Sequence, residues 1–216
     1  MKKLLLSLLF LTTAALSFSQ SYVSFKYSQI YSKFYYRDEG GKPDPSLRAD
    51  MRTGYGLDFK RMVKGGIYVG AEFWYKNLGA VSFLNNQKLD WSLHYLDLNL
   101  GGGYMLQRFK VKPYIGVSFY GGYLFKANQT IATNYYNMLD NNTIKRWDYG
   151  LNVNGGVLYA FSSVTAVFFE VMQSRGLHQL EVSNKQKLYN SALSFRFGLS
   201  FLIEQGASNY NYKFRD

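Results

Sequence analysis

Large apolar residues occupy every second position through most of the chain after Gln20, and the positions between them are small or polar. A period of two is typical of β-strands with one apolar face. The segment 67–76 (IYVGAEFWYK) is one example. Eight such segments occur, most of them of about 9–12 residues, which is the length that a tilted strand needs to cross a bilayer. They cover residues 23–36, 54–60, 67–76, 91–100, 113–123, 148–159, 165–174 and 193–201.

Two irregularities interrupt this alternation. In the first segment the apolar residues change parity near Gln29–Ile30 and continue through Phe34 and Tyr36, which predicts a phase slip. A second change of parity at Tyr95–Leu96 predicts a β-bulge. No convincing period of 3.6 residues accompanies the alternation, so the chain is expected to be all-β.

The connections between these segments alternate in length. Three are short (61–66, 106–110 and 160–164), whereas four are long and polar (37–48, 77–88, 126–145 and 175–187). Short turns at one end and long loops at the other are typical of outer-membrane barrels. The sequence therefore predicts an eight-stranded antiparallel up-and-down transmembrane β-barrel with both termini on the periplasmic side. A soluble periplasmic lipocalin-like barrel, with its apolar parity turned inward, is the alternative fold.

The first nineteen residues have the pattern of a secretory signal peptide. Lys2 and Lys3 precede an apolar run, and the small residues Ser17 and Ser19 precede a cut before Gln20. The apolar run is shorter than the ~20 residues of a spanning helix. We expect a signal peptide over residues 1–19, a barrel over 20–203 and a polar C-terminal tail over 204–216.

Composition agrees with this class. Hydrophobic residues make up 47% of the chain and aromatic residues 19%, which argues against disorder. The mean hydropathy of −0.21 is compatible with a membrane barrel because its lipid-facing and lumen-facing residues average out. The absence of cysteine excludes disulfides, thiolate metal sites and cysteine nucleophiles.

Four stretches carry a family resemblance: YLDLNLGGGYML (95–106), KPYIGVSFYGGYLF (112–125), WDYGLNVNGGVLYAF (147–161) and FFEVMQSRGLHQL (168–180). They resemble the PorT-like outer-membrane β-barrel proteins. The resemblance implies an eight-stranded barrel whose members mostly lack assigned biochemistry, and the name-giving member is linked to protein secretion across the outer membrane. Barrel chains often end on an aromatic residue, and this chain departs from that pattern because a polar tail follows Phe201.

The polar parity of the strands is expected to fill the lumen, since eight strands enclose a space that side chains can occupy. Charged residues on this parity should pair, because a lone buried ion costs several kcal/mol. Five acids and five bases form the expected lumen charge network: Lys26, Arg52, Asp58, Glu72, Lys76, Asp97, Lys112, Asp148, Glu170 and Arg196. An ion-paired plug is one interpretation, and a gated polar path or a site for a polar ligand is the other.

Candidate chemistry is sparse. His94, near Asp90 and Ser92, and His178 are the only histidines, so a His-Ser-Asp arrangement at the rim is conceivable. No G-x-S-x-G motif and no metal-ligand spacing accompany them. We expect no catalytic site, no metal and no cofactor.

The formal net charge of +11 indicates contact with anionic lipid headgroups. The residues beside the short turns that should contact periplasmic phosphates are Lys60, Arg61, Lys64, Arg108 and Lys110. Basic residues of the long connections, such as Arg48 and Lys145, should face lipopolysaccharide. Long loops could bind protein partners, and nucleic acid is not expected. These observations favour a structural, adhesive or assembly-partner barrel without catalysis. The alternatives are a transport or binding barrel for a small molecule, a rim lipid-modifying enzyme and the soluble binder.

Overall fold

A computed structural model describes residues 20–37, 46–84, 87–131, 134–140, 143–182 and 187–204. The expected signal peptide and the tail beyond Glu204 lie outside the described residues, and so do the side chains of Tyr36, Arg37, Lys64, Leu84 and Glu204. Within the described part of the chain, no helix is long and apolar enough to cross a membrane.

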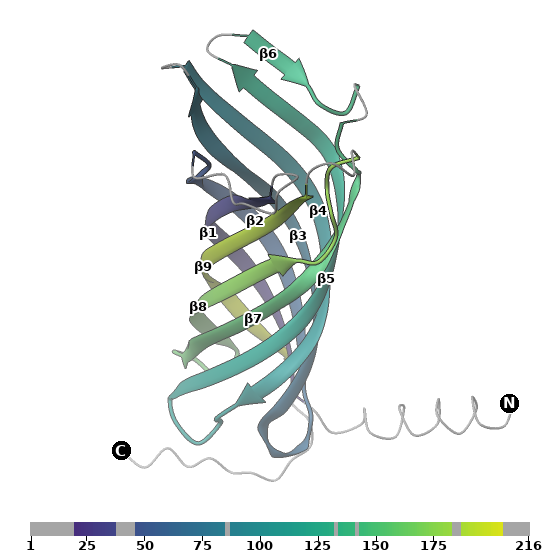
Figure 1. Ribbon diagram of the computed structural model, residues 1–216. Helices are drawn as coiled ribbons and strands as arrows, with labels where there is room; N and C mark the ends of the chain where they lie inside the picture. Colours follow the sequence, from purple (N-terminus) through teal and green to yellow (C-terminus); the bar gives the residue numbers. More distant parts are fainter. Residues whose placement is uncertain are drawn as a thin grey trace, which may run out of the picture.

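The described residues hold nine strands and one 3-10 turn, η1 (Lys64–Gly66). The strands, labelled in Figure 1, are β1 (Ser21–Arg37), β2 (Arg48–Met62), β3 (Ile67–Leu84), β4 (Gln87–Met105), β5 (Val111–Ile131), β6 (Asn134–Asn137), β7 (Trp147–Ala160), β8 (Thr165–Gly176) and β9 (Lys187–Glu204).

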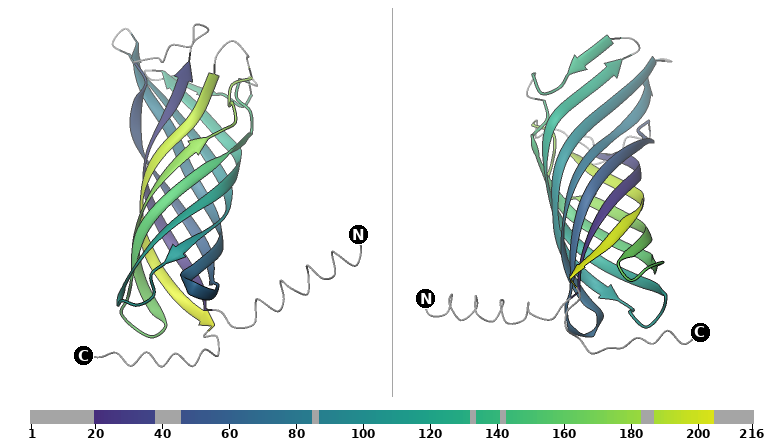
Figure 2. Two further views of the ribbon diagram at one scale, coloured as in Figure 1. Left: turned by 60° about the horizontal axis from the view of Figure 1, so that its bottom comes forward. Right: turned by 180° about the vertical axis from the view of Figure 1, so that it is seen from behind.

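Eight of these strands close into a ring. Each strand of the ring pairs antiparallel with its neighbours in sequence order, and β9 returns to pair with β1 along the whole of β1. The short β6 pairs only with the end of β5 and stands outside the ring. Closure leaves the ring without an open sheet edge, which a wall in contact with lipid requires. Figure 2 shows the resulting barrel, whose strands are tilted relative to its axis. The fold class predicted from the alternation is therefore confirmed.

The two ends of the barrel differ. At one end, here called the turn end, β1 begins beside the last residue of β9, and the connections are the short 63–66, 106–110 and 161–164. At the other end, the loop end, the strands are longer than expected. The connection expected over 77–88 shrinks to residues 85–86, and most of 126–145 belongs to β5 and β6. Figure 1 and the right view of Figure 2 show β3 to β6 projecting beyond the other strands.

The apolar parity faces outward. Exposed side chains such as Phe73, Leu98 and Ile115 form a belt around the middle of the barrel, and the same residues alternate with buried ones such as Trp74, Asp97 and Tyr114. An inverted, lipocalin-like arrangement is excluded by this orientation. The belt suits a hydrocarbon solvent, because apolar side chains outside and polar ones inside are what a membrane barrel needs.

The prediction of a phase slip in β1 near Gln29–Ile30 is wrong. Pairing of β1 with β2 and with β9 runs through Gln29 and Ile30 without a change of register, and Ile30 and Phe34 remain on the inward parity. Both residues are apolar because they belong to a packed cluster inside the barrel. Near the loop end, an apolar residue is therefore not necessarily one that faces lipid.

The bulge near Tyr95 exists, but the extra residue lies in the partner strand. Tyr95 pairs with Leu124 and His94 pairs with Lys126, so Phe125 of β5 has no partner in β4. In β4 the alternation continues unbroken, with Leu93 and Tyr95 both buried inside.

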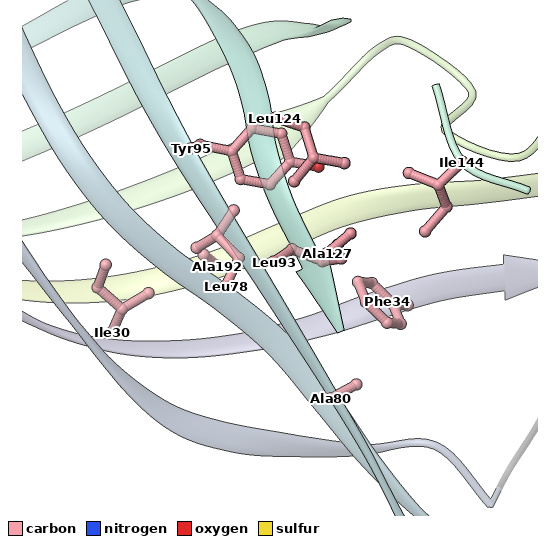
Figure 3. Packing of buried hydrophobic residues seen from close by; sticks show 10 residues of the cluster. All are labelled: Ile30, Phe34, Leu78, Ala80, Leu93, Tyr95, Leu124, Ala127, Ile144 and Ala192. Atoms are coloured by element: carbon pink, nitrogen blue, oxygen red, sulfur yellow. The ribbon is translucent and has the colours of Figure 1, made fainter. Parts of the chain in front are cut away.

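Two apolar clusters close the lumen at its ends. Figure 3 shows the cluster at the loop end, which we call the upper plug. Its buried members are Ile30, Phe34, Leu78, Ala80, Leu93, Tyr95, Leu124, Ala127, Ile144 and Ala192. The lower plug, at the turn end, consists of Tyr22, Met62, Tyr68, Met105, Tyr114, Leu158, Ala166 and Phe168. The ion pairs of Lys26, Lys76 and Arg196 lie between these two plugs.

Candidate functional site

The centre of the lumen is a three-strand ion cluster. Lys26 of β1 places its Nζ 3.1 Å from Asp58 of β2 and 2.5 Å from Glu72 of β3. Asp58 also forms an ion pair with Lys60, whose Nζ lies 3.2 Å from the Asp58 carboxylate. Asp58 and Glu72 are register partners in neighbouring strands, which is why one ammonium group reaches both carboxylates.

Arg196 of β9 extends this cluster across the lumen. Its Nη1 lies 3.1 Å from Glu72 and 3.3 Å from Glu170. The guanidinium also stacks over Trp74 at 4.2 Å, and the indole of Trp74 donates to Glu72 at 2.8 Å. Arg196 therefore joins β3, β8 and β9 through one side chain, which fits the planar, five-donor geometry of a guanidinium.

A second polar layer lies nearer the loop end. Lys76 pairs with Asp97. Asp148 has no basic partner among the described residues, and it accepts hydrogen bonds from Tyr120 at 3.2 Å and Asn190 at 2.7 Å. Asn190 also donates to the hydroxyl of Tyr95 at 3.2 Å, so this layer connects with the upper plug.

Two expected lumen residues lie apart from this network. Arg52 is at the loop end, where it pairs with Asp50 at 2.6 Å and with Asp90. Lys112 is half-buried near the turn end, and within the described residues it makes no ion pair. The structure thus gathers eight of the ten between the plugs.

The position of Lys60 contradicts the headgroup contact that we expected for it. Its side chain is buried, and its ammonium group lies over the rings of Tyr68 and Tyr114, at 5.5 and 4.7 Å from their centroids. It therefore contacts no headgroup. Arg61 is half-buried, whereas Arg108 and Lys110 are exposed in the short turn between β4 and β5, so their contact with phosphates stays a prediction. The side chain of Lys64 lies outside the described residues.

Glycines allow the large lumen side chains to fit. A Cβ added at Gly56 would lie 2.5 Å from the Trp74 ring, and one at Gly116 would lie 2.2 Å from the hydroxyl of Tyr68. Beside Asp58, Glu72 and Asn154 the network leaves about 20 Å³ of space, enough for about one water molecule. The lumen of the described barrel is filled rather than open.

The rim residues that could have formed a hydrolytic triad do not assemble as one. Ser92 and His94 are in contact, with 3.2 Å between Oγ and Nε2. Asp90, however, pairs with Arg52 and Lys88, and the Nδ1 of His94 meets the hydroxyl of Tyr75 at 2.8 Å instead. His178 contacts the carbonyl of Trp147 at 2.8 Å and stacks on Tyr149. Across the described residues, no group of three acids or histidines could hold a metal ion.

A groove of about 530 Å³ lies on the outside of the wall over β9, β1, β2 and β3. Its walls are outward aromatic and aliphatic side chains, including Phe25, Tyr55, Phe73 and Phe197. The lining is apolar and belongs to the outward belt, so the groove is suited to lipid chains rather than to a polar substrate.

The fold, the belt and the filled lumen define a small membrane barrel, and the comparisons with known proteins agree. The chain belongs to the family described as outer membrane protein beta-barrel domain, whose model matches residues 9–182. The family places the protein in the bacterial outer membrane.

Two solved structures show the same fold. One is the outer membrane protein OprG from Pseudomonas aeruginosa, at 13% identity and a TM-score of 0.59, covering 87% of this chain and 97% of that one. The other is Neisserial surface protein A, at 12% identity and a TM-score of 0.52, covering 85% and 97%. No curated protein matches the chain.

Proposed function

We propose that the protein is a non-catalytic, non-conducting outer-membrane barrel of the structural, adhesive or assembly-partner type, which acts through the surface of its loop end. The filled lumen is the observation that carries this proposal. Ion pairs link β1, β2, β3, β8 and β9 across the interior, and an apolar plug lies on each side of them. A solute would have to displace paired charges and packed aromatic rings to pass.

The proposal includes an orientation. The even number of ring strands and the short turns support a turn end, with both termini, in the periplasm and a loop end outside the cell. In this orientation the projection formed by β3 to β6 is the part most available to a partner. It exposes Tyr135 and Tyr136 of β6, and tyrosine is enriched in protein interfaces.

Lipid is the other proposed partner. The basic residues near both ends support contact with phospholipid headgroups at the turn end and with lipopolysaccharide at the loop end. The narrower PorT-like assignment is supported by the resemblance of four wall segments, and it would make protein secretion the process that the loop-end surface serves.

Single-channel recording in planar bilayers tests the filled lumen. The wild-type protein, shown to be folded by faster migration of the unboiled sample on a gel, should give no stable conductance steps. Reproducible steps from folded protein would contradict the proposal and favour a transport barrel. In parallel, lipid A from cells with and without the gene should be identical, and a change in its acylation would contradict the absence of catalysis.

A further inference from the structure

The outward face of β3, β4 and β5 changes character at one level of the barrel. Toward the turn end the outward residues are apolar, ending at Tyr75 and Leu96. Directly beyond them, Asn77, Ser92 and His94 follow on the same parity. Aromatic girdles mark the boundary between hydrocarbon and headgroups in outer-membrane barrels. The polar group beyond Tyr75 therefore lies where lipid headgroups begin.

The bulge in β5 adds a lysine to this group. Leu124 and Ala127 are fully buried inside, whereas Phe125 and Lys126 between them are both exposed. With the extra residue, Lys126 points outward and pairs in register with His94. Without it, the inward parity of Leu124 would carry Lys126 into the lumen. Bulges are features that re-aim side chains, and this one directs an ammonium group to the outer surface.

The other members of the group are held in place by one another. The imidazole of His94 contacts the hydroxyl of Tyr75 at 2.8 Å and that of Ser92 at 3.2 Å, and Ser92 donates to Asn77 at 3.0 Å. The rings of Tyr75 and Phe125 lie at 6.0 and 6.1 Å from that of His94. The hydroxyls of Tyr75 and Ser92 and the ring of His94 are thus bonded to one another, and these bonds do not use the amide N–H groups of Asn77, which lie in the same cross-strand row as Lys126.

The charge of this spot is positive. Lys126 has no ion-pair partner in the described part of the chain. The nearest acid along β4, Asp90, is already paired with Arg52 and with Lys88 at 3.2 Å. An exposed ammonium group in the same row as the amide N–H groups of Asn77 matches an anion with several acceptor oxygens.

We propose that Tyr75, Asn77, Ser92, His94 and Lys126 form an external binding site for the phosphate group of a membrane lipid. This inference rests on the proposed function for the source of the phosphate: with the loop end outside the cell, the site faces the phosphorylated glycolipid of the outer leaflet.

The two histidines of the chain offer a direct probe. The protein is labelled with ¹³C-histidine, held in a maltoside detergent that contains no phosphate, and titrated with phosphorylated lipid A while NMR spectra are recorded. The signal of His94 should shift and saturate. The signal of His178, which stacks on Tyr149 of β7 and is bonded to none of the five residues, is the internal reference and should stay in place. No shift at His94, or an equal shift of both signals, overturns the proposal.

A matched pair of lysine variants isolates the charge. Lys126→Gln should weaken binding about tenfold, as expected for the loss of one charge-assisted contact. Lys33→Gln removes another exposed, outward lysine, in β1 beside Ser191, and should leave binding unchanged. Equal affinities of Lys126→Gln and the wild type overturn the site. Neither substitution touches the lumen, so both proteins should fold.

Different lipids separate the site from the orientation. Dephosphorylated lipid A should leave His94 unshifted, and a full shift with it overturns the role of phosphate. Tighter binding of phosphorylated lipid A than of phosphatidylglycerol supports the outer leaflet as the source. Tighter binding of phosphatidylglycerol supports a phosphate site but contradicts the proposed orientation of the barrel.

Discussion

Residues with large rings determine how the lumen packs, and the glycines opposite them determine whether it can close. Gly56→Val should therefore destabilise the barrel by about 1–3 kcal/mol, the usual cost of overpacking, because its side chain would overlap the ring of Trp74. Unfolding by guanidinium in lipid vesicles measures this. Gly121→Val is the control, since nothing lies within 4 Å of a Cβ at that position. Equal stability of the two variants would contradict the packing described for Trp74.

Arg196 is the residue on which the central ion cluster depends most. Its replacement by methionine leaves Glu72 and Glu170 without their shared guanidinium, so Arg196→Met should cost about 3–5 kcal/mol of unfolding free energy. Adding Glu170→Gln removes one uncompensated charge, and the double variant should be more stable than Arg196→Met alone. A double variant whose loss is simply the sum of two single losses would show that the pair is not coupled.

Single residues also show where sequence reasoning works and where it ends. Parity alone places Asp58 and Glu72 inside, since strands alternate strictly. Lys60 shares the parity of Asp58, yet its nearness to a short turn suggested a headgroup contact. The wall continues to Met62, so Lys60 is still enclosed and reaches Asp58. Arg196 pairs with Glu72 across the lumen because of the curvature of the barrel. The alternation of residues along one strand does not show which inward residues pair in this way.

Strands were harder to delimit than to recognise. The alternation located each strand of the ring, but it failed where β3, β4 and β5 leave the belt. Beyond the belt the strict alternation is lost, because β3 carries apolar residues on both parities, such as Leu78 and Val81, whereas β5 carries mostly polar ones over residues 126–131. Hydrogen-bonded pairing therefore continues after the period-two signal has ended. Ile30 and Phe34 show the converse: an apolar plug inside the barrel imitates a lipid-facing run.

The projecting β6 provides a test of orientation at the level of elements. The chain has no cysteine, so a single introduced thiol is the only reactive one. Tyr136→Cys, exposed in β6, should react with a membrane-impermeant maleimide on intact cells. Val164→Cys, exposed in the turn between β7 and β8, should react only after the outer membrane is opened. The reverse pattern would contradict a periplasmic turn end.

At the scale of the whole molecule, the mild mean hydropathy results from two opposed faces. The outer face is apolar because lipid surrounds it, and the inner face holds charge because those charges neutralise one another. Most of the excess positive charge of the chain therefore lies at the two ends of the barrel and at outward positions such as Lys126. Under the proposed function, the specific contacts of a barrel filled in this way are expected on its outside.

The entire architecture depends on the seam where the first and last strands meet. Gln29 of β1 and Phe195 of β9 are register partners on the outward parity. Antiparallel partners have Cα atoms about 4.5–5.5 Å apart, within the range of a disulfide. The double variant Gln29→Cys/Phe195→Cys should therefore crosslink on oxidation, and a reducing agent should reverse the change in gel mobility. In Gln29→Cys/Leu199→Cys the second thiol is displaced along β9 by roughly 13 Å, so no crosslink should form. Crosslinking of both pairs, or of neither, would mean that the ring does not close in this register.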